Sequence, residues 1–279
     1  MTPTIHPAAH VDSGARIGPG CVIGPGVVIE NGASLGAGCR VEAHAVITRH
    51  ARVGDRTVIG HGALIGGDPQ ILGFDPATAS TVEVGCDNTL REYCTLHRGS
   101  KPGSATRVGN HNYLMAGVHL GHDVQLANHT IIANNTLLAG HVEVQDRVVI
   151  GGGSVFHQFV RIGRLAMIQG ISGAGKDIPP FCIACAVNRV AGLNVIGMRR
   201  AGMDAAARAD IKRAYQLLYL AGHNVSAALA AAGQMEWSPG AREFFGFVAQ
   251  AKRRGICAPL QRGAGRNAEN ADEADGEPG

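Results

Sequence analysis

Aliphatic residues recur at every sixth position along most of the chain. One unbroken run covers residues 5–65, a second covers residues 108–168, and three aliphatics between them share the phase of the second run. The first run is Ile5, Val11, Ile17, Ile23, Ile29, Leu35, Val41, Ile47, Val53, Ile59 and Ile65. The later positions are Val84, Leu90, Leu96, Val108, Leu114, Leu120, Leu126, Ile132, Leu138, Val144, Ile150, Phe156, Ile162 and Ile168.

A small or β-branched residue stands two positions before each aliphatic of the first run, as Cys21 stands before Ile23 and Cys39 before Val41. Residues two apart in a strand face the same side, so both members of each pair are expected to point inward. Glycine often follows the aliphatic and permits a tight corner. One short strand cannot bury its own apolar face, so successive turns must stack. The pattern predicts an all-β solenoid with Cys21 and Cys39 as core thiols.

Two segments rich in turn residues break the repeat. They are GGDPQILGFDPATAS at residues 66–80 and RGSKPGSATR at residues 98–107. We interpret both as loops that leave the solenoid wall, and loops of this kind often carry function.

The repeat ends near SGAGKDIPPF at residues 172–181, and helical spacing begins after Asn194. Candidate helices cover residues 204–221, 224–232 and 240–254, with Ser-Pro-Gly between the last two. The predicted organisation is a solenoid at residues 1–190, a C-terminal α-helical region at 191–260 and a disordered acidic tail at 261–279.

Composition and charge narrow the class of protein. In the 279 residues, no apolar run approaches 18, so no membrane span is expected. The first residues lack a secretory pattern and the seven cysteines are dispersed, which favours reduced thiols and a cytoplasmic location. The net charge is +3, and because the tail carries −3 the remaining residues carry +6. That charge suits an acidic partner or anionic substrate and is too weak for a nucleic-acid-binding domain.

The repeat resembles that of the hexapeptide-repeat transferases, whose fold is a left-handed parallel β-helix. In that fold three hexapeptides form one triangular coil. Leu120, Leu138 and Phe156 are three hexapeptides apart, and the residues closely following them include three histidines: His122, His141 and His157. These histidines are expected to line one corner, with His119 just before it and Asp123 beside His122. A histidine oriented by a carboxylate is suited to general-base catalysis near neutral pH.

Other interpretations of these residues remain open. Histidines on a solenoid wall can simply be solvated, and His119, His122 and a third histidine could bind zinc, as in hexapeptide-repeat carbonic anhydrases. The Cys182-Ile-Ala-Cys185 spacing also occurs in redox and zinc sites, but without a second pair we interpret it as structural. A solenoid without catalytic activity that serves as a binding module is a further alternative.

Five segments point to one family within the hexapeptide proteins. They are TLHRGS (95–100), GVHLGHDV (117–124), LANHTIIANNTLLAGHV (126–142), IGGGSVFHQF (150–159) and GLNVIGMRRAGM (192–203). Together with the helical tail they resemble the acyl-[acyl carrier protein]–UDP-N-acetylglucosamine O-acyltransferases, which open lipid A biosynthesis. The resemblance implies a homotrimer with active sites between subunits, acyl carrier protein as the acyl donor on its phosphopantetheine, and neither a separate cofactor nor a metal.

The resemblance also implies residue roles. His122 matches the general base for the sugar 3-hydroxyl, Asp123 the carboxylate beside it, and Gly140 the backbone donor to the oxyanion. Gly170 matches the position that limits acyl length. The other matched substrate-binding positions are Gln70, His97, His119, His141, His157, Gln158, Asn194 and Arg200.

The chain departs from the family pattern in the first loop. Where the family has Gln-Asp-Leu-Lys-Tyr, this chain has Gln70-Ile71-Leu72-Gly73-Phe74, which lacks the acid and the lysine that hold the sugar. Near the nucleotide end, Ile196 replaces an acid and Ala201 an arginine, and Cys185-Ala186 replaces a Gly-Asn pair. The sequence therefore leaves open a paralogue that acylates a different sugar, or another hydroxyl or amine.

Overall fold

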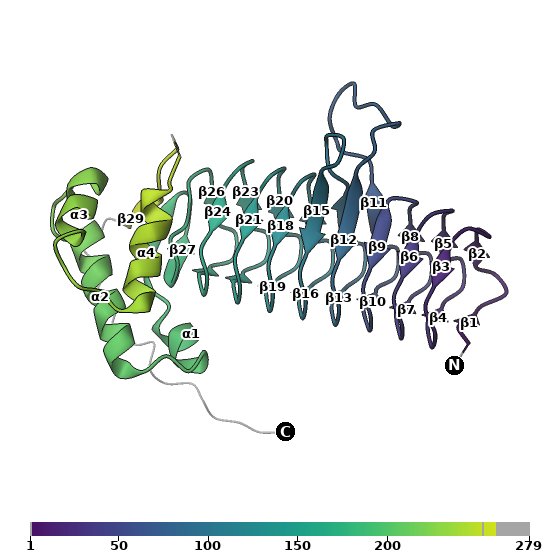
Figure 1. The fold of residues 1–279 in the computed structure, drawn as a ribbon, viewed down its shortest axis with the longest axis horizontal. Helices are drawn as coiled ribbons and strands as arrows, with labels where there is room; N and C mark the ends of the chain where they lie inside the picture. Colours follow the sequence, from purple (N-terminus) through teal and green to yellow (C-terminus); the bar gives the residue numbers. More distant parts are fainter. Residues whose placement is uncertain (1, 253, 261–279) are drawn as a thin grey trace.

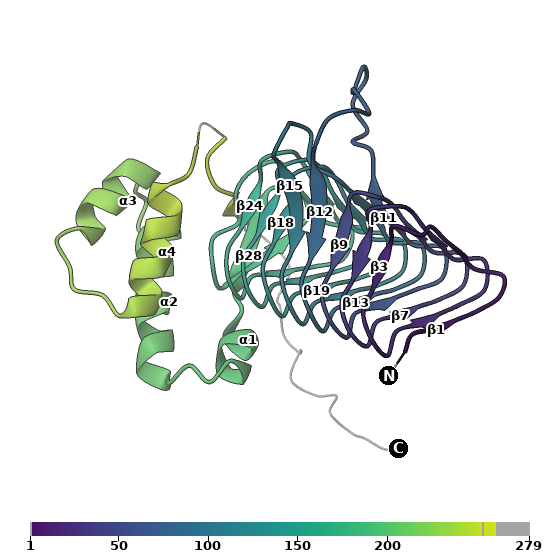
Figure 2. The same cartoon turned by 45° about the vertical axis from the view of Figure 1, so that its right-hand side comes forward.

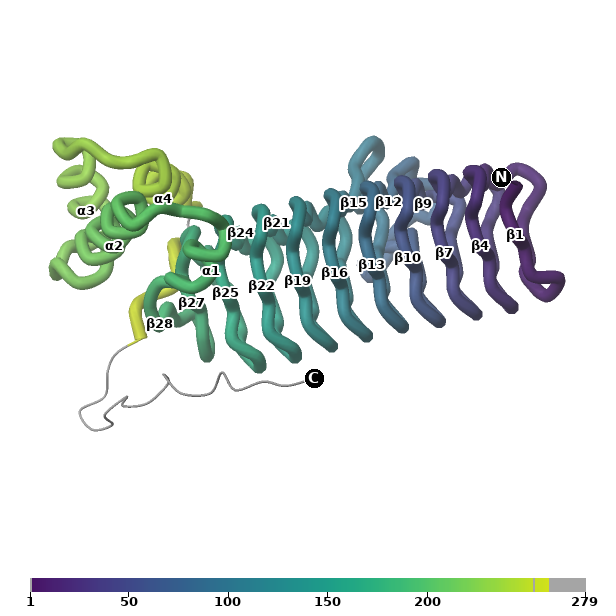
Figure 3. Tube along the Cα trace, turned by 90° about the horizontal axis from the view of Figure 1, so that it is seen from below, coloured from purple at the N-terminus to yellow at the C-terminus, as the bar shows by residue number. Residues whose placement is uncertain are grey.

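The chain forms a long prism of stacked triangular coils, with helices packed at its C-terminal end (Figures 1 and 2). The computed structural model describes residues 2–252 and 254–260, and the predicted acidic tail at 261–279 lies outside them. The prism has three walls, each a mainly parallel sheet to which successive coils contribute one strand (Figure 3 shows one wall). The six-residue repeat thus builds the predicted parallel β-helix.

The walls are named here sheets A, B and C, in the order in which the chain visits them. Sheet A contains β1 (Thr4–Ile5), β4 (Val22–Ile23), β7 (Arg40–Val41), β10 (Val58–Ile59), β13 (Thr89–Leu90), β16 (Tyr113–Leu114), β19 (Ile131–Ile132), β22 (Val149–Ile150), β25 (Met167–Ile168), β27 (Cys182–Cys185), β28 (Arg189–Leu193) and β29 (Ala258–Pro259). Sheet B contains β2 (His10–Val11), β5 (Val28–Ile29), β8 (Val46–Ile47), β11 (Leu64–Gly67), β14 (Thr95–His97), β17 (His119–Leu120), β20 (Leu137–Leu138), β23 (Val155–Phe156) and β26 (Gly173–Ala174). Sheet C contains β3 (Arg16–Ile17), β6 (Ser34–Leu35), β9 (Ala51–Val53), β12 (Thr81–Val84), β15 (Ala105–Val108), β18 (Gln125–Leu126), β21 (Glu143–Val144) and β24 (Arg161–Ile162).

The core is a stack of the predicted inward pairs. Cys21 and Ile23 are buried while Val22 between them is 47% exposed, which is the alternation expected of a wall with one apolar face. Cys39 is likewise buried, so both thiols lie in the core as predicted. Strands pair in register from coil to coil, so that the Ile23 position stacks on that of Val41. Complete burial of one such aliphatic stabilises the fold by about 1.5–3 kcal/mol.

Both predicted loops leave the prism at the corner between sheets B and C. The longer loop, residues 68–80, connects β11 to β12 and rises clear of the coils (Figure 1). The shorter loop, residues 98–104, connects β14 to β15 in the next coil. This corner, which we call the B–C edge, continues through residues 121–124, 139–142 and 157–160 of the following coils. The histidine-rich segments of the sequence therefore lie on the same edge as the two loops.

The C-terminal region contains helices α1 (Val195–Arg200), α2 (Ala205–Tyr219), α3 (Val225–Ala232) and α4 (Pro239–Ala249). Side chains of Asp204, Asn224 and Ser238 cap the last three, as the sequence favours at helix starts. The short helix α1 is not among the predicted helices. Helix α4 ends at Ala249, before the predicted boundary at residue 254, and Gln250 is its C-cap. The chain then turns at Gly255, and Ile256 pairs with Asp177 at the end of the prism.

Two arginines of the last complete coil hold the helices against the prism. Arg161 forms an ion pair with Asp177 at 2.6 Å and also donates to the Phe247 carbonyl of α4. Arg164 forms an ion pair with Glu243 of α4, also at 2.6 Å. Within the described residues, no helix is both long and apolar enough to cross a membrane.

Candidate active site

His122, Asp123 and His141 form a compact cluster on the B–C edge. His122 follows β17 and His141 follows β20, one coil further on. The Nδ1 atom of His122 lies 2.9 Å from Oδ2 of Asp123, and Nε2 of His141 lies 3.7 Å from the same oxygen. Asp123 and His141 both have a left-handed backbone, with φ of 61° and 59°, at equivalent corners of successive coils. Coil stacking thus brings together two of the predicted site histidines and their carboxylate.

Asp123 is a buried carboxylate with three hydrogen-bond donors on one oxygen. Oδ2 accepts from the Ser100 N–H at 3.0 Å, from the Ser100 hydroxyl at 2.6 Å and from His122 Nδ1. Burial raises the pKa of Asp123, but hydrogen bonds from Ser100 and His122 outweigh it and lower the pKa to about 2. Asp123 is therefore ionised at neutral pH and fixes the His122 proton on Nδ1. This tautomer leaves Nε2 of His122 with a free lone pair.

Gly140 provides the space that His122 occupies. A Cβ at residue 140 would lie 2.4 Å from both Nε2 and Cε1 of His122, so any larger residue would displace the imidazole. The Gly140 N–H donates no hydrogen bond to another described residue. His122 Nε2 and an available backbone donor are therefore close neighbours on this edge.

His157 does not continue the expected column of histidines. The coil register places Phe159, and not His157, next to His141, and the two rings stack with centroids 4.5 Å apart. His157 is exposed, and its Nδ1 accepts a hydrogen bond from Arg254 at 2.6 Å. The adjacent Gln158 is also exposed. The sequence predicts equivalent positions for His122, His141 and His157. They are not equivalent, because they stand two, three and one residues after Leu120, Leu138 and Phe156.

A second imidazole pair, His97 and His119, lies on sheet B beside this cluster. Their ring centroids are 5.0 Å apart, and His119 Nδ1 lies 2.9 Å from the Thr95 hydroxyl. Burial, with a smaller contribution from His97, lowers the pKa of His119 to about 4. His119 is consequently neutral at pH 7 and suited to hydrogen bonding with an uncharged group.

The long loop presents an uncharged tip. Gln70 and Ile71 are exposed and the Leu72 side chain is completely so. Gly73 has φ of 75°, a left-handed conformation that glycine adopts without strain. The tip therefore offers one amide and two aliphatic side chains to whatever binds beside it.

Asn194 and Arg200 lie in a separate groove, of about 750 Å³, along sheet A and α1. Arg200 is exposed, whereas Asn194 is buried and its amide is occupied: it caps α1 at the Gly197 N–H and donates to the Leu165 carbonyl. Gly170 lies elsewhere again, on the corner between sheets A and B. The predicted site residues of a single chain thus form separate groups.

Three contacts were missed by the sequence analysis. Ser100 and Arg98 lie in the second loop, where the six-residue repeat is interrupted. Counting along the repeat therefore does not predict their partners, which depend on how the loops fold. Phe159 could have been found, because it stands at the position of the next coil that is equivalent to His141.

The cluster also has the composition of a metal site, since one ligand atom from each of His122, Asp123 and His141 lies within 4.8 Å of the others. The donor set nevertheless fits a hydrogen-bonded pair better. The Asp123 oxygen nearest the histidines already accepts three hydrogen bonds, one of them from His122 Nδ1. A cation would have to displace these donors, so the residues as arranged do not form a ready metal site.

Comparisons with known proteins agree on one family. Residues 177–257 match the family model described as UDP-N-acetylglucosamine O-acyltransferase, domain 2, and residues 105–140 match bacterial transferase hexapeptide repeats. An acyl-[acyl-carrier-protein]–UDP-N-acetylglucosamine O-acyltransferase from Synechocystis is 38% identical over 67% of this chain and 68% of its own. A protein of the same name from Burkholderia lata is 43% identical over 58% of this chain and 62% of its own.

Solved structures extend the similarity to nearly the whole chain. The UDP-N-acetylglucosamine acyltransferase of Bacteroides fragilis has a TM-score of 0.85 at 36% identity and covers 91% of this chain and 99% of that one. The enzyme from Campylobacter jejuni has the same TM-score at 32% identity, with the same coverage of both chains. These matches support the left-handed parallel β-helix that the resemblance implied. The chain belongs to the UDP-N-acetylglucosamine O-acyltransferase family and is an acyltransferase.

Proposed function

We propose that the protein transfers a 3-hydroxyacyl group from acyl carrier protein to the 3-hydroxyl of UDP-N-acetylglucosamine, the first step of lipid A biosynthesis. The observation that carries the proposal is the oriented imidazole: ionised Asp123 accepts a hydrogen bond from Nδ1 of His122, so that in the neutral ring the lone pair is on Nε2, beside Gly140. A hydroxyl is a poor nucleophile until a base removes its proton, and a positioned imidazole is suited to that task.

The geometry supports direct transfer without a covalent enzyme intermediate. Nε2 of His122 takes the proton from the acceptor hydroxyl as its oxygen attacks the thioester carbon. The Gly140 N–H stabilises the oxyanion that forms on the thioester oxygen. Collapse breaks the carbon–sulfur bond, and the thiolate leaves with the proton from His122. Ester and free carrier thiol are the products, and His122 returns to its initial state.

The outer face of sheet B provides a track for the acyl chain. The row that begins at His119 continues through Leu137, Val155 and Gly173. Leu137 and Val155 are 45% and 48% exposed, although both are apolar. Three steps between strands cover about 14 Å, ending near the corner that carries Gly170. We propose that this row binds the acyl chain and that Gly170 leaves room at its end.

We propose a homotrimer in which a neighbour completes each site. In one chain, Arg200 lies on the sheet A groove while His122 lies on the B–C edge. The groove floor includes Ile131, Val149 and Met167, which are between 37% and 42% exposed. Contact between this face of one subunit and the B–C edge of the next would unite both groups of residues and cover the aliphatics.

The donor and location follow from the same proposal. The acyl group arrives on the phosphopantetheine of acyl carrier protein, an acidic partner suited to the +6 charge of residues 1–260, so no separate cofactor or metal is required. Acyl carrier protein and nucleotide sugars place the reaction in the cytoplasm.

The uncharged loop tip favours one alternative, an acyltransferase with a different acceptor. Ile71 and Gly73 stand where the family has an acid and a lysine that hold the sugar. The base, its carboxylate and the oxyanion donor are unchanged, so only recognition of the acceptor would differ. An acceptor screen with 3-hydroxyacyl carrier proteins of several chain lengths distinguishes the two.

Substitution His122→Ala is expected to lower turnover about 10²–10⁴-fold, or about 3–5 kcal/mol of barrier, because the base is lost. The thermal unfolding temperature should fall only modestly, because Asp123 loses one hydrogen-bond donor and keeps the two from Ser100. Single-turnover rates at saturating acyl carrier protein measure the effect, with exposed His61→Ala as the control. A near wild-type rate for His122→Ala, with a collapse for His119→Ala or His141→Ala, would show that another histidine is the base.

Substitution Asp123→Asn is expected to reduce stability in a pH-dependent way. The folded pKa of about 2 lies below the unfolded value of about 3.9, so ionised Asp123 stabilises the fold above pH ~4. This contribution is lost as the pH falls from about 4 to 2. Denaturant unfolding at fixed protein concentration should show the gap between wild type and variant narrowing over that range. A gap that stays constant from neutral pH down to pH ~2 would contradict the hydrogen-bonded carboxylate at Asp123.

Substitution Ile71→Asp is expected to raise kcat/KM for UDP-N-acetylglucosamine if the wild type uses that sugar poorly, because it restores the carboxylate of the family loop. The corresponding lysine at Gly73 would require a left-handed backbone at a cost of about 1 kcal/mol, so the single variant is the cleaner test. The adjacent, fully exposed Leu72→Asp is the matched control. Full wild-type efficiency on this sugar would instead show that the altered loop is neutral.

Mixed trimers test the shared site. Inactive His122→Ala and Arg200→Ala subunits, co-refolded in equal amounts, should regain activity, because about a quarter of the interfaces unite an intact His122 with an intact Arg200. Each variant refolded alone is the control. If both residues serve a site within one chain, the mixture stays as inactive as its components.

A further inference from the structure

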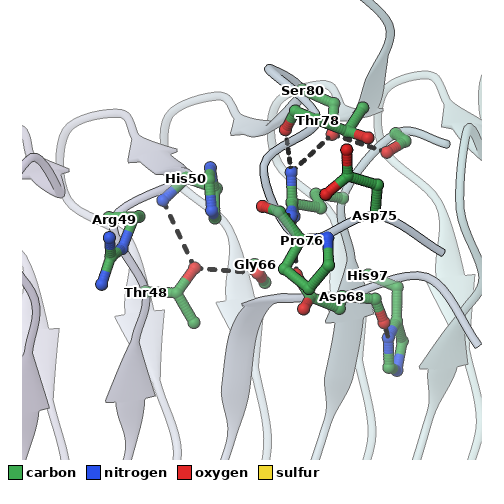
Figure 4. A network of polar contacts seen from close by, with 12 residues as sticks. Thr48, Arg49, His50, Gly66, Asp68, Asp75, Pro76, Thr78, Ser80 and His97 are labelled. Carbon is green, nitrogen blue, oxygen red and sulfur yellow. Dashed lines mark hydrogen bonds and ion pairs between the residues drawn. The ribbon is translucent and has the colours of Figure 1, made fainter. Parts of the chain in front are cut away.

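Arg98 is a completely buried cation that the mechanism above does not use. It follows His97 at the end of β14, with none of its side chain exposed. Its Nε donates to Oδ1 of Asp68 at 2.8 Å and its Nη2 to the Pro76 carbonyl at 2.8 Å. Its Nη1 donates to the Ser80 hydroxyl at 3.1 Å and to the Thr78 carbonyl. Figure 4 shows these partners gathered beside the prism wall.

Every one of these partners belongs to the loop at residues 68–80. The guanidinium also lies 4.8 Å from the centre of the Phe74 ring, in the same loop. A buried cation that loses its partners is strongly unfavourable, so the loop cannot swing away without leaving Arg98 unpaired. The long loop is thus a fixed wall of the site, held along most of its length by a single side chain.

The longer loop also determines which ring nitrogen of His97 carries a proton. The Asp68 carbonyl lies 2.6 Å from Nδ1 of His97. A carbonyl can only accept, so Nδ1 of His97 carries a proton, and whenever the ring is neutral its lone pair is on Nε2. His97 is buried, and its ring faces His119 at 5.0 Å. Asp68 therefore links the two residues: its carboxylate binds the buried guanidinium of Arg98, and its backbone carbonyl sets the tautomer of His97.

We propose that Arg98 is a positioning residue for the acceptor substrate, acting through Asp68 to fix both the loop at residues 68–80 and the tautomer of His97. The inference rests on the proposed acyltransferase function of this edge. Arg98 touches no reacting atom, and His122 and Asp123 keep their own contacts without it. Loss of the clamp should therefore weaken acceptor binding while the chemical step at His122 continues.

Kinetics of Arg98→Lys and Arg98→Ala provide the test. Lysine keeps the charge but not the planar fork that reaches four partners, so we expect KM for the acceptor to rise about tenfold in Arg98→Lys and further in Arg98→Ala. The KM for acyl carrier protein and the single-turnover rate at saturating acceptor should stay within about threefold of wild type. Guanidinium ion should partly restore the acceptor KM of Arg98→Ala.

Arg107→Ala is the matched control. Arg107 on β15 forms an ion pair with Glu83 at 2.9 Å, but it is half exposed, and its side chain has no hydrogen bond or ion pair with residues 68–80. Its removal should leave both KM values unchanged. The positioning role would be overturned if Arg98→Lys changed the KM for the acceptor and the KM for acyl carrier protein equally, or if it lowered only the single-turnover rate.

Two further readouts do not depend on the acceptor. Chymotrypsin should cut after Leu72 or Phe74 at least about tenfold faster in Arg98→Lys than in wild type or Arg107→Ala. Nitrogen NMR should show His97 protonated on Nδ1 in wild type and a mixture of tautomers in Arg98→Lys. Unchanged cleavage and an unchanged tautomer would overturn the clamp. If these shifts appear but the wild type does not acylate UDP-N-acetylglucosamine, the proposed function fails and the clamp stands, and the KM comparison is made with the acceptor found by screening.

Discussion

The register of one coil on the next is the constraint on which the rest of this structure depends. Tyr113 pairs with Ile131 of the following coil, and even across the shorter loop Thr95 pairs with His119. These pairings leave no freedom to slide, because the inward aliphatics must stack. The same register determines what meets on the outside: Gly140 lies beneath His122 only because it is the equivalent position of the next coil, and only glycine fits there. Core packing and site geometry are therefore consequences of one periodicity.

The six-residue repeat also explains which parts of the structure can be predicted from the sequence. Strand positions, the inward thiols and the two loop excursions all follow from counting in sixes. The contacts inside the loops do not follow from the repeat. Arg98 and Ser100 meet their hydrogen-bond partners only because of how the loop backbone folds, and that backbone has no repeating pattern. Helix α1 was missed for a related reason: its six residues are too few to show helical spacing, and its start is set by the Asn194 cap.

The histidines illustrate a limit of counting residue types. The corners of the prism require a left-handed backbone, which polar side chains such as histidine, aspartate and asparagine tolerate better than branched ones. His44, His111, His129 and His141 all occupy such corners, and only His141 is near the carboxylate. A corner histidine is thus partly a product of backbone geometry. The informative signal in the sequence was Asp123 beside His122, because a buried carboxylate requires partners.

Asp123 and Arg98 are two solutions to the same electrostatic problem. Each is a charge removed from water on the B–C edge, and each is stabilised by hydrogen bonds from a loop that interrupts the repeat. Asp123 holds the shorter loop against His122, and Arg98 holds the longer loop against the His97 and His119 pair. The loops are consequently held by buried charge, although their outer surfaces are free to vary. This separation explains how the tip, with Ile71 and Gly73, can differ from the family pattern while His122 and Asp123 keep their contacts with each other and with Ser100.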